Sequence, residues 1–239
     1  MIVSINQPAY LPWLGYFHRI AVSDSHIILD HVQFEKNGFT NRNKVRTHEG
    51  WSWLTVPVQT SGKFGDLPIH CIKIANEQNW ASKHWQTLQF NYSKAPFFAQ
   101  HAAYLEDLYK RPWLRLADLA NEVTRYLLDA FGIHTKCYRS SEMSARGRKD
   151  ELLLNLCLEL GATTYLSGPL GRNYLREDLF NDHGITLRYD DYQHPTYPQV
   201  YTGFEAYMSA VDLLFNTGPA SLEIILKNQT LKSQENSNR

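Results

Sequence analysis

The chain of 239 residues contains few cysteines and no long apolar run, and each absence excludes a class of protein. Its three cysteines are too few and too widely spaced for a disulfide framework or a zinc signature. No window approaches the ~20 apolar residues of a membrane-spanning helix. The amino terminus also lacks the basic and apolar regions of a signal peptide. We therefore expect a protein of the reducing cytoplasm with no transmembrane segment.

The chain also lacks a net charge, because 24 acidic residues balance 24 basic ones. This balance argues against nucleic-acid binding by bulk electrostatics, although a local basic cluster stays open. Apolar residues make up 43% of the chain and aromatic residues 13%. The apolar fraction is sufficient for a buried core. Tyrosine and tryptophan combine an apolar body with a polar tip, so they suit ligand pockets and interfaces.

The first 46 residues predict a strand, a loop, a helix and a second strand. The apolar run at residues 2–5 ends in the polar residues 6–8, and apolar residues recur at helical spacing over 13–21. A second apolar run at residues 25–29 ends in Asp30. Such a unit usually forms two parallel strands, and ligands bind beyond the carboxyl ends of parallel strands. We therefore predict a ligand site at this edge.

Short strands and helices alternate over the rest of the chain. This pattern predicts an α/β fold with an open, mostly parallel sheet and helices on both faces, plus a β-hairpin and a helical insertion. One domain (1–226) and a polar, disordered tail (227–239) are expected, with a mobile loop at 59–66. The further expected strands are 44–47, 51–56, 67–74, 134–139, 163–166 and 185–189, and the further expected helices are 80–92, 95–110, 114–131, 150–160, 174–180, 204–215 and 220–226.

Hydrogen-bonding side chains gather at the predicted sheet edge and form the first candidate site. Arginine presents a planar fork that suits carboxylate or phosphate, and amide side chains add neutral donors and acceptors. A solvated turn would contain many of the same residue types. The candidates are Gln7 and Tyr10 after the first strand and Asp30, Gln33, Lys36, Asn41, Arg42 and Asn43 after the second.

Two later segments supply further substrate-binding candidates. The turn after residues 163–166 contains Ser167, Gly168 and Arg172, and its backbone N–H groups could face an anion. The Pro- and Tyr-rich loop contains Tyr197 and Gln199, whose side chains could line a sugar or a purine. The same glycines could serve the turn alone, and the tyrosine could simply pack against the core.

Recognised catalytic motifs are absent. The sequence contains neither a phosphate-binding loop nor a dinucleotide fingerprint, a catalytic triad, an HExxH motif or a metal-ligand spacing. His84 falls on the apolar stripe of the helix predicted at 80–92, where it is either a core histidine or a base. His18 could reach a phosphate at the start of the first helix, but a packed or exposed histidine would give the same pattern.

Several segments resemble the WbqC-like protein family. They are QPAYLPWLGYF, SDSHIILDHVQFEKNGFTNRNKV, WLTVPV, YLSGPLGRNYL and SAVDLLFNTG, and the resemblance extends from residue 1 to about residue 218. It implies a bacterial protein, because members of this family occur in gene clusters for O-antigen and other surface polysaccharides. The resemblance implies no single reaction.

A weaker likeness concerns the topology of the first strands. The order strand, Pro-containing loop, helix and strand is similar to the start of pantothenate synthetases and nucleotidylyltransferases, which bind ATP phosphates with a His-x-Gly-His loop. Here residues 13–16 occupy that loop without either histidine. The likeness implies a nucleotidylyltransferase-like topology, with ATP as a possible cofactor.

The resemblance to the WbqC-like protein family implies an enzyme of surface polysaccharide synthesis, and we predict that it transfers an acyl or aminoacyl group to an amino sugar or nucleotide sugar. Asp30 or His84 would act as general base, and Arg42, with Lys36 and Arg172, would offset negative charge. The alternatives are an ATP-using nucleotidylyltransferase or adenylate-forming ligase, and a non-catalytic sugar- or nucleotide-binding module. We expect a small-molecule partner, no nucleic acid and no metal, and a homodimer is possible.

Overall fold

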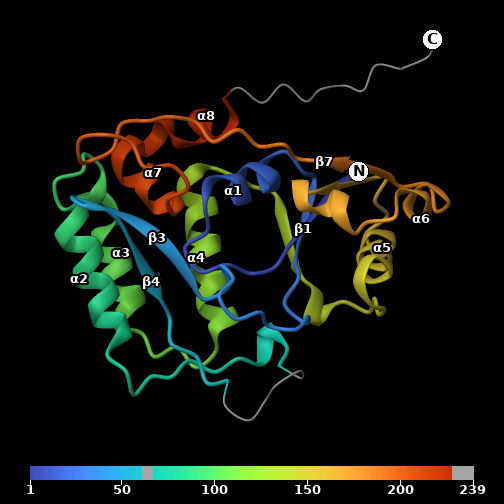
Figure 1. Cartoon of the computed structure of the whole chain (residues 1–239), viewed down its shortest axis with the longest axis horizontal. Helices are drawn as coiled ribbons and strands as arrows, with labels where there is room; N and C mark the ends of the chain where they lie inside the picture. The colour runs from blue at the N-terminus through green and yellow to red at the C-terminus, as the bar shows by residue number, and fades with distance from the viewer. Residues whose placement is uncertain (61–66, 228–239) are drawn as a thin grey trace.

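A five-stranded parallel sheet with the strand order β5-β2-β1-β6-β7 forms the centre of the fold (Figure 1). The computed structural model describes residues 1–60 and 67–227. All four neighbouring strand pairs are parallel, so the predicted α/β fold is confirmed. The strands are β1 (Ile2–Asn6), β2 (Ser25–Ile28), β5 (Lys136–Arg139), β6 (Thr164–Ser167) and β7 (Thr186–Tyr189).

Helices cover both faces of this sheet. Side chains alternate between the faces of a strand, so Val3 and Ile5 pack in the core formed with α5 and α6. Ser4 faces the other side, where its hydroxyl donates to the backbone oxygen of Arg19 on α1. No helix in the described part of the chain is long and apolar enough to cross a membrane. The helices on these faces are α1 (Leu14–Ala21), α4 (Leu116–Phe131), α5 (Lys149–Glu159) and α6 (Glu177–Asn181).

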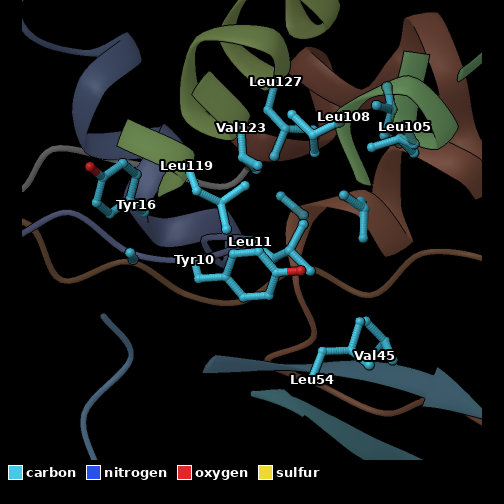
Figure 2. Packing of buried hydrophobic residues seen from close by; sticks show 14 of the residues in the cluster. Tyr10, Leu11, Tyr16, Val45, Leu54, Leu105, Leu108, Leu119, Val123 and Leu127 are labelled. Carbon is cyan, nitrogen blue, oxygen red and sulfur yellow. The ribbon is translucent and has the colours of Figure 1, made fainter. Parts of the chain in front are cut away.

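A hairpin and a helical layer pack beside the α1 face in one large core. Figure 2 shows Tyr10 and Leu11 between the α4 side chains and the hairpin residues Val45 and Leu54. The hairpin is antiparallel, as predicted. These elements are β3 (Arg42–Thr47), β4 (Gly50–Thr55), α2 (Trp80–Tyr92), α3 (Phe98–Lys110), α7 (Ala210–Thr217) and α8 (Ser221–Leu226), and the short 3-10 turns are η1 (Ile69–Cys71), η2 (Ser140–Glu142), η3 (Pro169–Asn173) and η4 (Gly218–Ala220).

Two predicted elements are wrong. The strand expected at 67–74 is the turn η1 with isolated bridges, because its neighbours come from three separate segments and no single strand runs beside it. The helix expected at 204–215 begins only at Ala210. Tyr207 has a φ of +61°, which an α-helix cannot accommodate, and Ser209 is the N-cap whose hydroxyl accepts from the Val211 N–H. Most of the loop predicted at 59–66 and of the tail predicted at 227–239 lies outside the described residues.

Candidate functional site at the carboxyl edge of the sheet

The strand order reverses at β1. The chain places β2 and then β5 on one side of β1, and later places β6 and β7 on the other. In open α/β sheets, ligands bind outside the carboxyl ends of the strands at such a reversal. The strand ends are neighbours there, because Asn6 pairs with Ile28, and Ile28 with Arg139. The polar residues at this edge are Asn6, Gln7, Asp30, Arg139, Ser167 and Asp190.

Asp30 has the most hydrogen bonds at this edge. Its buried carboxylate accepts from Arg139 Nε at 2.9 Å, from the Ser140 hydroxyl at 3.1 Å, and from the backbone N–H and hydroxyl of Ser141 at 2.8 and 2.9 Å. Burial raises the pKa of Asp30, but the bonds from Arg139 and Ser141 outweigh it, so the pKa lies below its usual value. A carboxylate that stays ionised and accepts four hydrogen bonds is better suited to holding its neighbours in place than to accepting a proton as a general base. The role of Asp30 in catalysis stays a prediction.

Two histidines beside Asp30 each use one ring nitrogen internally. His70 Nδ1 lies 3.1 Å from the backbone oxygen of Asp30, and His31 Nδ1 lies 2.6 Å from Ser140 Oγ. A carbonyl oxygen only accepts, so His70 Nδ1 carries a proton. The Ser140 hydroxyl donates to the Asp30 carboxylate, so His31 Nδ1 is best assigned as a donor too. In the neutral form of His31, Nε2 then retains a lone pair that can accept a proton.

The two imidazoles come from segments that run antiparallel. Gln33 and Pro68 form a bridge, and counting back from it places His31 opposite His70. Burial lowers the pKa of His31; Asp30 raises it less, and Arg146 and His70 lower it further. His31 is therefore mostly neutral at pH 7. The described residues contain no group of three or more His, Cys, Asp or Glu side chains that could hold a metal ion.

At the reversal itself, the guanidinium of Arg19 lies among the ends of three strands. Arg19 donates to the side-chain oxygen of Asn6, and its Nε lies 3.6 Å from the carboxylate of Asp190. A Cβ at Gly168 would lie 2.8 Å from an Arg19 nitrogen, so a glycine lets the turn after β6 approach the guanidinium closely. The Arg19 side chain is 11% exposed. This arrangement places a planar cation at the expected ligand position.

His18 lies beside the same carboxylate. Its Nδ1 is 3.1 Å from Asp190, and its ring centre is 4.8 Å from that of Tyr192. His18 is 1% exposed. Within the described chain, His18 Nε2, the Tyr192 hydroxyl and the Asn6 side-chain nitrogen are buried without a hydrogen-bond partner. Buried polar atoms usually have partners, so these three retain bonding capacity close to Arg19.

Among the predicted site residues, Gln7, Asp30, Ser167 and Gly168 lie at this edge. Gln7 is half-buried and directly follows β1, while Ser167 ends β6 and is buried. Gln33 lies next to the edge in the loop after β2, where its side-chain oxygen accepts from the backbone of residue 67 at 2.8 Å. These residues end or follow parallel strands at the predicted edge, and their role in binding a substrate stays a prediction.

Asn41 and Asn43 fix the hairpin instead. The Asn41 side chain donates to the backbone oxygen of Val56 at 2.9 Å, and the Asn43 side chain donates to that of Leu11 at 2.6 Å. Both asparagines are buried. Their amide N–H groups therefore already have acceptors in the protein backbone.

Arg42 and Lys36 lie near the start of the hairpin. Arg42 donates to the backbone oxygen of Asn37 at 2.6 Å, and its guanidinium lies 4.4 Å from the ring centre of Trp53. Lys36 is exposed, and within the described chain it forms no hydrogen bond or ion pair. Arg42 thus stabilises a surface hairpin, and its predicted catalytic role has no support from these contacts.

Tyr10 and His84 meet inside the helical layer. The Tyr10 hydroxyl lies 2.9 Å from His84 Nδ1 and 2.6 Å from the hydroxyl of Tyr109. Burial lowers the pKa of His84 to about 4, so the ring is neutral at pH 7. The cluster is packed among Trp80 and other core side chains. These bonds are those of a core histidine, and its role as a base stays a prediction.

The remaining predicted residues bond to other acids. Tyr197 and Gln199 both donate to the buried carboxylate of Asp212 on α7 at 2.8 Å. Arg172 forms a two-pronged pair with Asp191 at 2.6 and 2.7 Å. Tyr197 and Gln199 thus hold the loop that precedes α7 in place, and Arg172 already has a carboxylate partner at the surface.

Several residues at this edge were not predicted. Arg139 ends a predicted strand, and Ser140 and Asp190 each directly follow one, so the rule that selected Asp30 would have found them. Arg19 gives no such signal, because it lies on a helix. His70 gives none either, because its segment resembles a strand in sequence.

Comparison with known proteins supplies the family. The family model described as "WbqC-like protein family" matches residues 7–224. "Uncharacterized protein Rv1507c" of Mycobacterium tuberculosis (strain ATCC 25618 / H37Rv) is 38% identical to this chain over 218 residues, which cover 90% of this chain and 94% of that protein. No solved structure matches the chain. The family match begins directly after β1 and covers β2, β5, β6 and β7 with the segments that follow them, and the chain belongs to the WbqC-like protein family.

Proposed function

We propose that this protein is a transferase of bacterial surface polysaccharide synthesis. It joins an acyl or aminoacyl group to the amine of an amino sugar that is carried as a nucleotide sugar. The observation that supports this proposal is His31, a neutral imidazole at the carboxyl edge whose Nδ1 is bonded inward. A base of this kind is what attack by an amine requires.

In the proposed reaction, the amine nitrogen attacks the carbonyl carbon of the acyl donor. His31 Nε2 accepts the proton that the amine loses. The bond between the carbonyl carbon and the leaving group breaks, and the leaving group departs with the electron pair and takes the proton from His31 Nε2, so that the neutral base is restored. Asp30 acts through Ser140, which orients the His31 ring. Asp30 is therefore a positioning residue in this scheme.

The carrier phosphates would lie at the strand reversal. Arg19 and the free amide nitrogen of Asn6 supply donors there, and Gln7 directly follows Asn6 in the chain. The donors suit a phosphate oxygen because arginine and amide N–H groups both bind anions. Asp190 offsets part of the positive charge of Arg19. A carrier with few negative charges fits this balance.

The proposal is tested with the full chain, UDP-glucosamine as amine acceptor, and acetyl-coenzyme A or glycyl adenylate as donor. Mass spectrometry would detect the acylated sugar. We expect His31→Gln to lower kcat by about 10²–10⁴-fold with little change in KM, because a positioned base contributes about that much. His183→Gln is the matched control, because His183 is exposed and its Nδ1 also has an oxygen partner, the backbone oxygen of Leu179. Full activity in His31→Gln would contradict the assignment.

A second function is favoured by the strand order. Counted along the chain, the five parallel strands run 3-2-1-4-5, and a Gly-containing turn covers Arg19 at the reversal. Nucleotides bind at such positions in doubly wound folds. A nucleotidylyltransferase would release pyrophosphate from ATP in the presence of a sugar phosphate. If ATP or UDP-glucosamine raises the melting temperature but neither reaction occurs, the chain is a non-catalytic binding module.

A further inference from the structure

A cavity lies in the helical layer, on elements separate from those that form the carboxyl edge. It has a volume of about 800 Å³ and lies between the C-terminal half of α2 and the loop at Tyr201. This volume falls within the ~300–1,000 Å³ of known small-molecule sites. None of its lining residues belongs to the five-stranded sheet or to the loops at its carboxyl edge. In Figure 1, α2 lies on the opposite side of the molecule from α5 and α6.

The α2 wall of this cavity includes side chains with free hydrogen-bonding groups. Gln86, Gln89 and Ser93 follow one another at intervals of three or four residues, so they share one side of α2, and all three are exposed. Gln86 makes one long bond of 3.4 Å to Ser82. In the described chain, the side chains of Gln89 and Ser93 form no hydrogen bond. Each amide therefore offers both a donor and an acceptor.

A fixed aromatic ring forms part of the opposite wall. The Tyr201 hydroxyl donates to the side-chain oxygen of Asn91 at 3.2 Å, and the guanidinium of Arg46 lies 5.7 Å from its ring centre. Arg46 is itself held by three backbone oxygens in the hairpin and the neighbouring loop. The ring thus has a defined position before any ligand arrives. Phe90, which is 75% exposed, supplies a second aromatic ring to the lining.

We infer that this cavity binds a saccharide. Sugar rings have apolar C–H faces that pack on aromatic rings, and hydroxyl groups that pair with amide and hydroxyl side chains. The lining contains both, in Phe90 and Tyr201 and in the two glutamines. Lys94 is its one charged side chain, so a neutral saccharide fits better than a polyanion. A purely apolar ligand would leave the amides without partners.

This inference does not depend on the proposed transfer reaction. The site would hold a saccharide whether or not the carboxyl edge is catalytic, so each proposal can fail alone. Placed apart from the edge, the cavity serves as a separate docking position for a glycan chain. The exposure of Phe90 at its rim supports this use, because large exposed aromatic side chains often mark binding surfaces.

The test is saturation-transfer NMR of the full chain with chitotriose, maltotriose and cellotriose, followed by titration of whichever trisaccharide responds. We expect signals from the sugar-ring protons of at least one of them. Phe90→Ala and Gln89→Ala should each weaken its affinity about five-fold or more, because each removes a direct contact. The matched control is Leu170→Ala, because Leu170 is another highly exposed apolar side chain and lies in η3. Its affinity should equal that of the wild type.

Three results would overturn the inference. The first is absence of saturation transfer to all three trisaccharides. The second is unchanged affinity in both Phe90→Ala and Gln89→Ala. The third is equal competition by the apolar peptide Leu-Leu-Leu, which would identify the cavity as a peptide site. Circular dichroism melting of each variant shows that it is folded, so that a loss of binding reports on the cavity.

Discussion

Asp30 and Asp212 are both fully buried acids, yet their environments act in opposite directions. Asp30 lies at the carboxyl edge of the sheet and accepts hydrogen bonds from a guanidinium and two serines. Asp212 lies on α7 and accepts hydrogen bonds from neutral groups, namely Tyr92, Tyr197 and Gln199 at 2.8 Å each. Burial raises the pKa of both acids. At Asp30 the hydrogen bonds outweigh burial and the pKa is lowered, whereas at Asp212 burial outweighs the hydrogen bonds and the pKa is raised.

The contrast is between a buried carboxylate that has a cation as a partner and one whose hydrogen-bond donors are neutral. A nearby cation offsets the cost of burying a carboxylate, and Arg139 supplies one to Asp30. The donors of Asp212 are uncharged, so they offset that cost only in part. Its three partners instead connect α2 and the loop before α7 to α7 itself. Asp212 therefore stabilises the helical layer, while Asp30 organises the edge where a ligand is expected.

The largest effect is expected from Asp212→Ala. The change leaves two buried tyrosine hydroxyls and one of the two N–H groups of the Gln199 amide without an acceptor, and each such group costs about 1–3 kcal/mol. We expect the free energy of unfolding to fall by about 3–5 kcal/mol, measured by urea denaturation. The exposed Asp182 gives a matched control, since Asp182→Ala should change stability by less than about 0.5 kcal/mol. A loss below about 1 kcal/mol in Asp212→Ala would contradict the anchor role.

Asp30→Asn should destabilise the protein less. The amide keeps the size of the side chain but loses the charge that pairs with Arg139. Arg139 is 30% exposed and can bind water instead, so we expect a loss of about 2–3 kcal/mol in the free energy of unfolding. In the transferase assay, Asp30→Asn should also lower kcat, because the Ser140 hydroxyl no longer orients His31 in the same way. If Asp30→Asn is less stable than Asp212→Ala, the expected order of the two effects is wrong.

The pH dependence of stability should differ in sign between the two acids. The pKa of Asp30 is lowered from 3.8 in the folded state, so its contribution is full above that pH and is lost as the pH falls through the folded pKa. The pKa of Asp212 is raised from 3.8, so its contribution is full below that pH and is lost as the pH rises through the folded pKa. The measurement is urea denaturation of the wild type, Asp30→Asn and Asp212→Asn between about pH 2.5 and 7. The difference in the free energy of unfolding between wild type and variant should grow with pH for Asp30→Asn and shrink with pH for Asp212→Asn. If this difference does not change with pH for either variant, both assignments are contradicted.

The smallest effects on stability are expected when one hydroxyl group that donates to Asp30 or to Asp212 is removed. Ser141→Ala should cost about 1 kcal/mol, because the backbone N–H of Ser141 still donates to Asp30. Tyr197→Phe should cost about 1–2 kcal/mol, because its bond to Asp212 is buried. Thermal unfolding of both variants gives the comparison. A greater loss of stability in Ser141→Ala than in Tyr197→Phe would show that a single hydrogen bond contributes more at the carboxyl edge than in the helical layer.

The fold was largely predictable because periodicity reports on burial. The apolar runs at 2–5 and 25–29 gave the central pair β1 and β2, and the amphipathic stripe of α4 ended at Gly132, whose φ is +72°. The prediction at 67–74 failed because an apolar segment without a continuous partner strand has the same composition as a strand. Tertiary contacts decide such cases, and the sequence does not display them.

The site was predictable only where it follows strands. Asp30, Ser167 and Gly168 lie at the edge because they end or follow parallel strands, which is a local property. Asn41 and Asn43 have the right chemistry for a ligand, but their acceptors are backbone oxygens far along the chain. His84 and Tyr197 likewise have partners on other elements. Long-range partners of this kind decide whether a polar residue binds a ligand or the protein itself.

The pairing of Ile2 with Thr164 has a consequence for biosynthesis. At about 5–20 residues per second, a ribosome needs roughly 10–30 s after β1 to synthesise β6, the strand that pairs with the second side of β1. During that interval one side of the first strand has free backbone groups, which attract other nascent chains. We expect newly made protein to depend on chaperones until β6 emerges, and the N-terminal third made alone to aggregate.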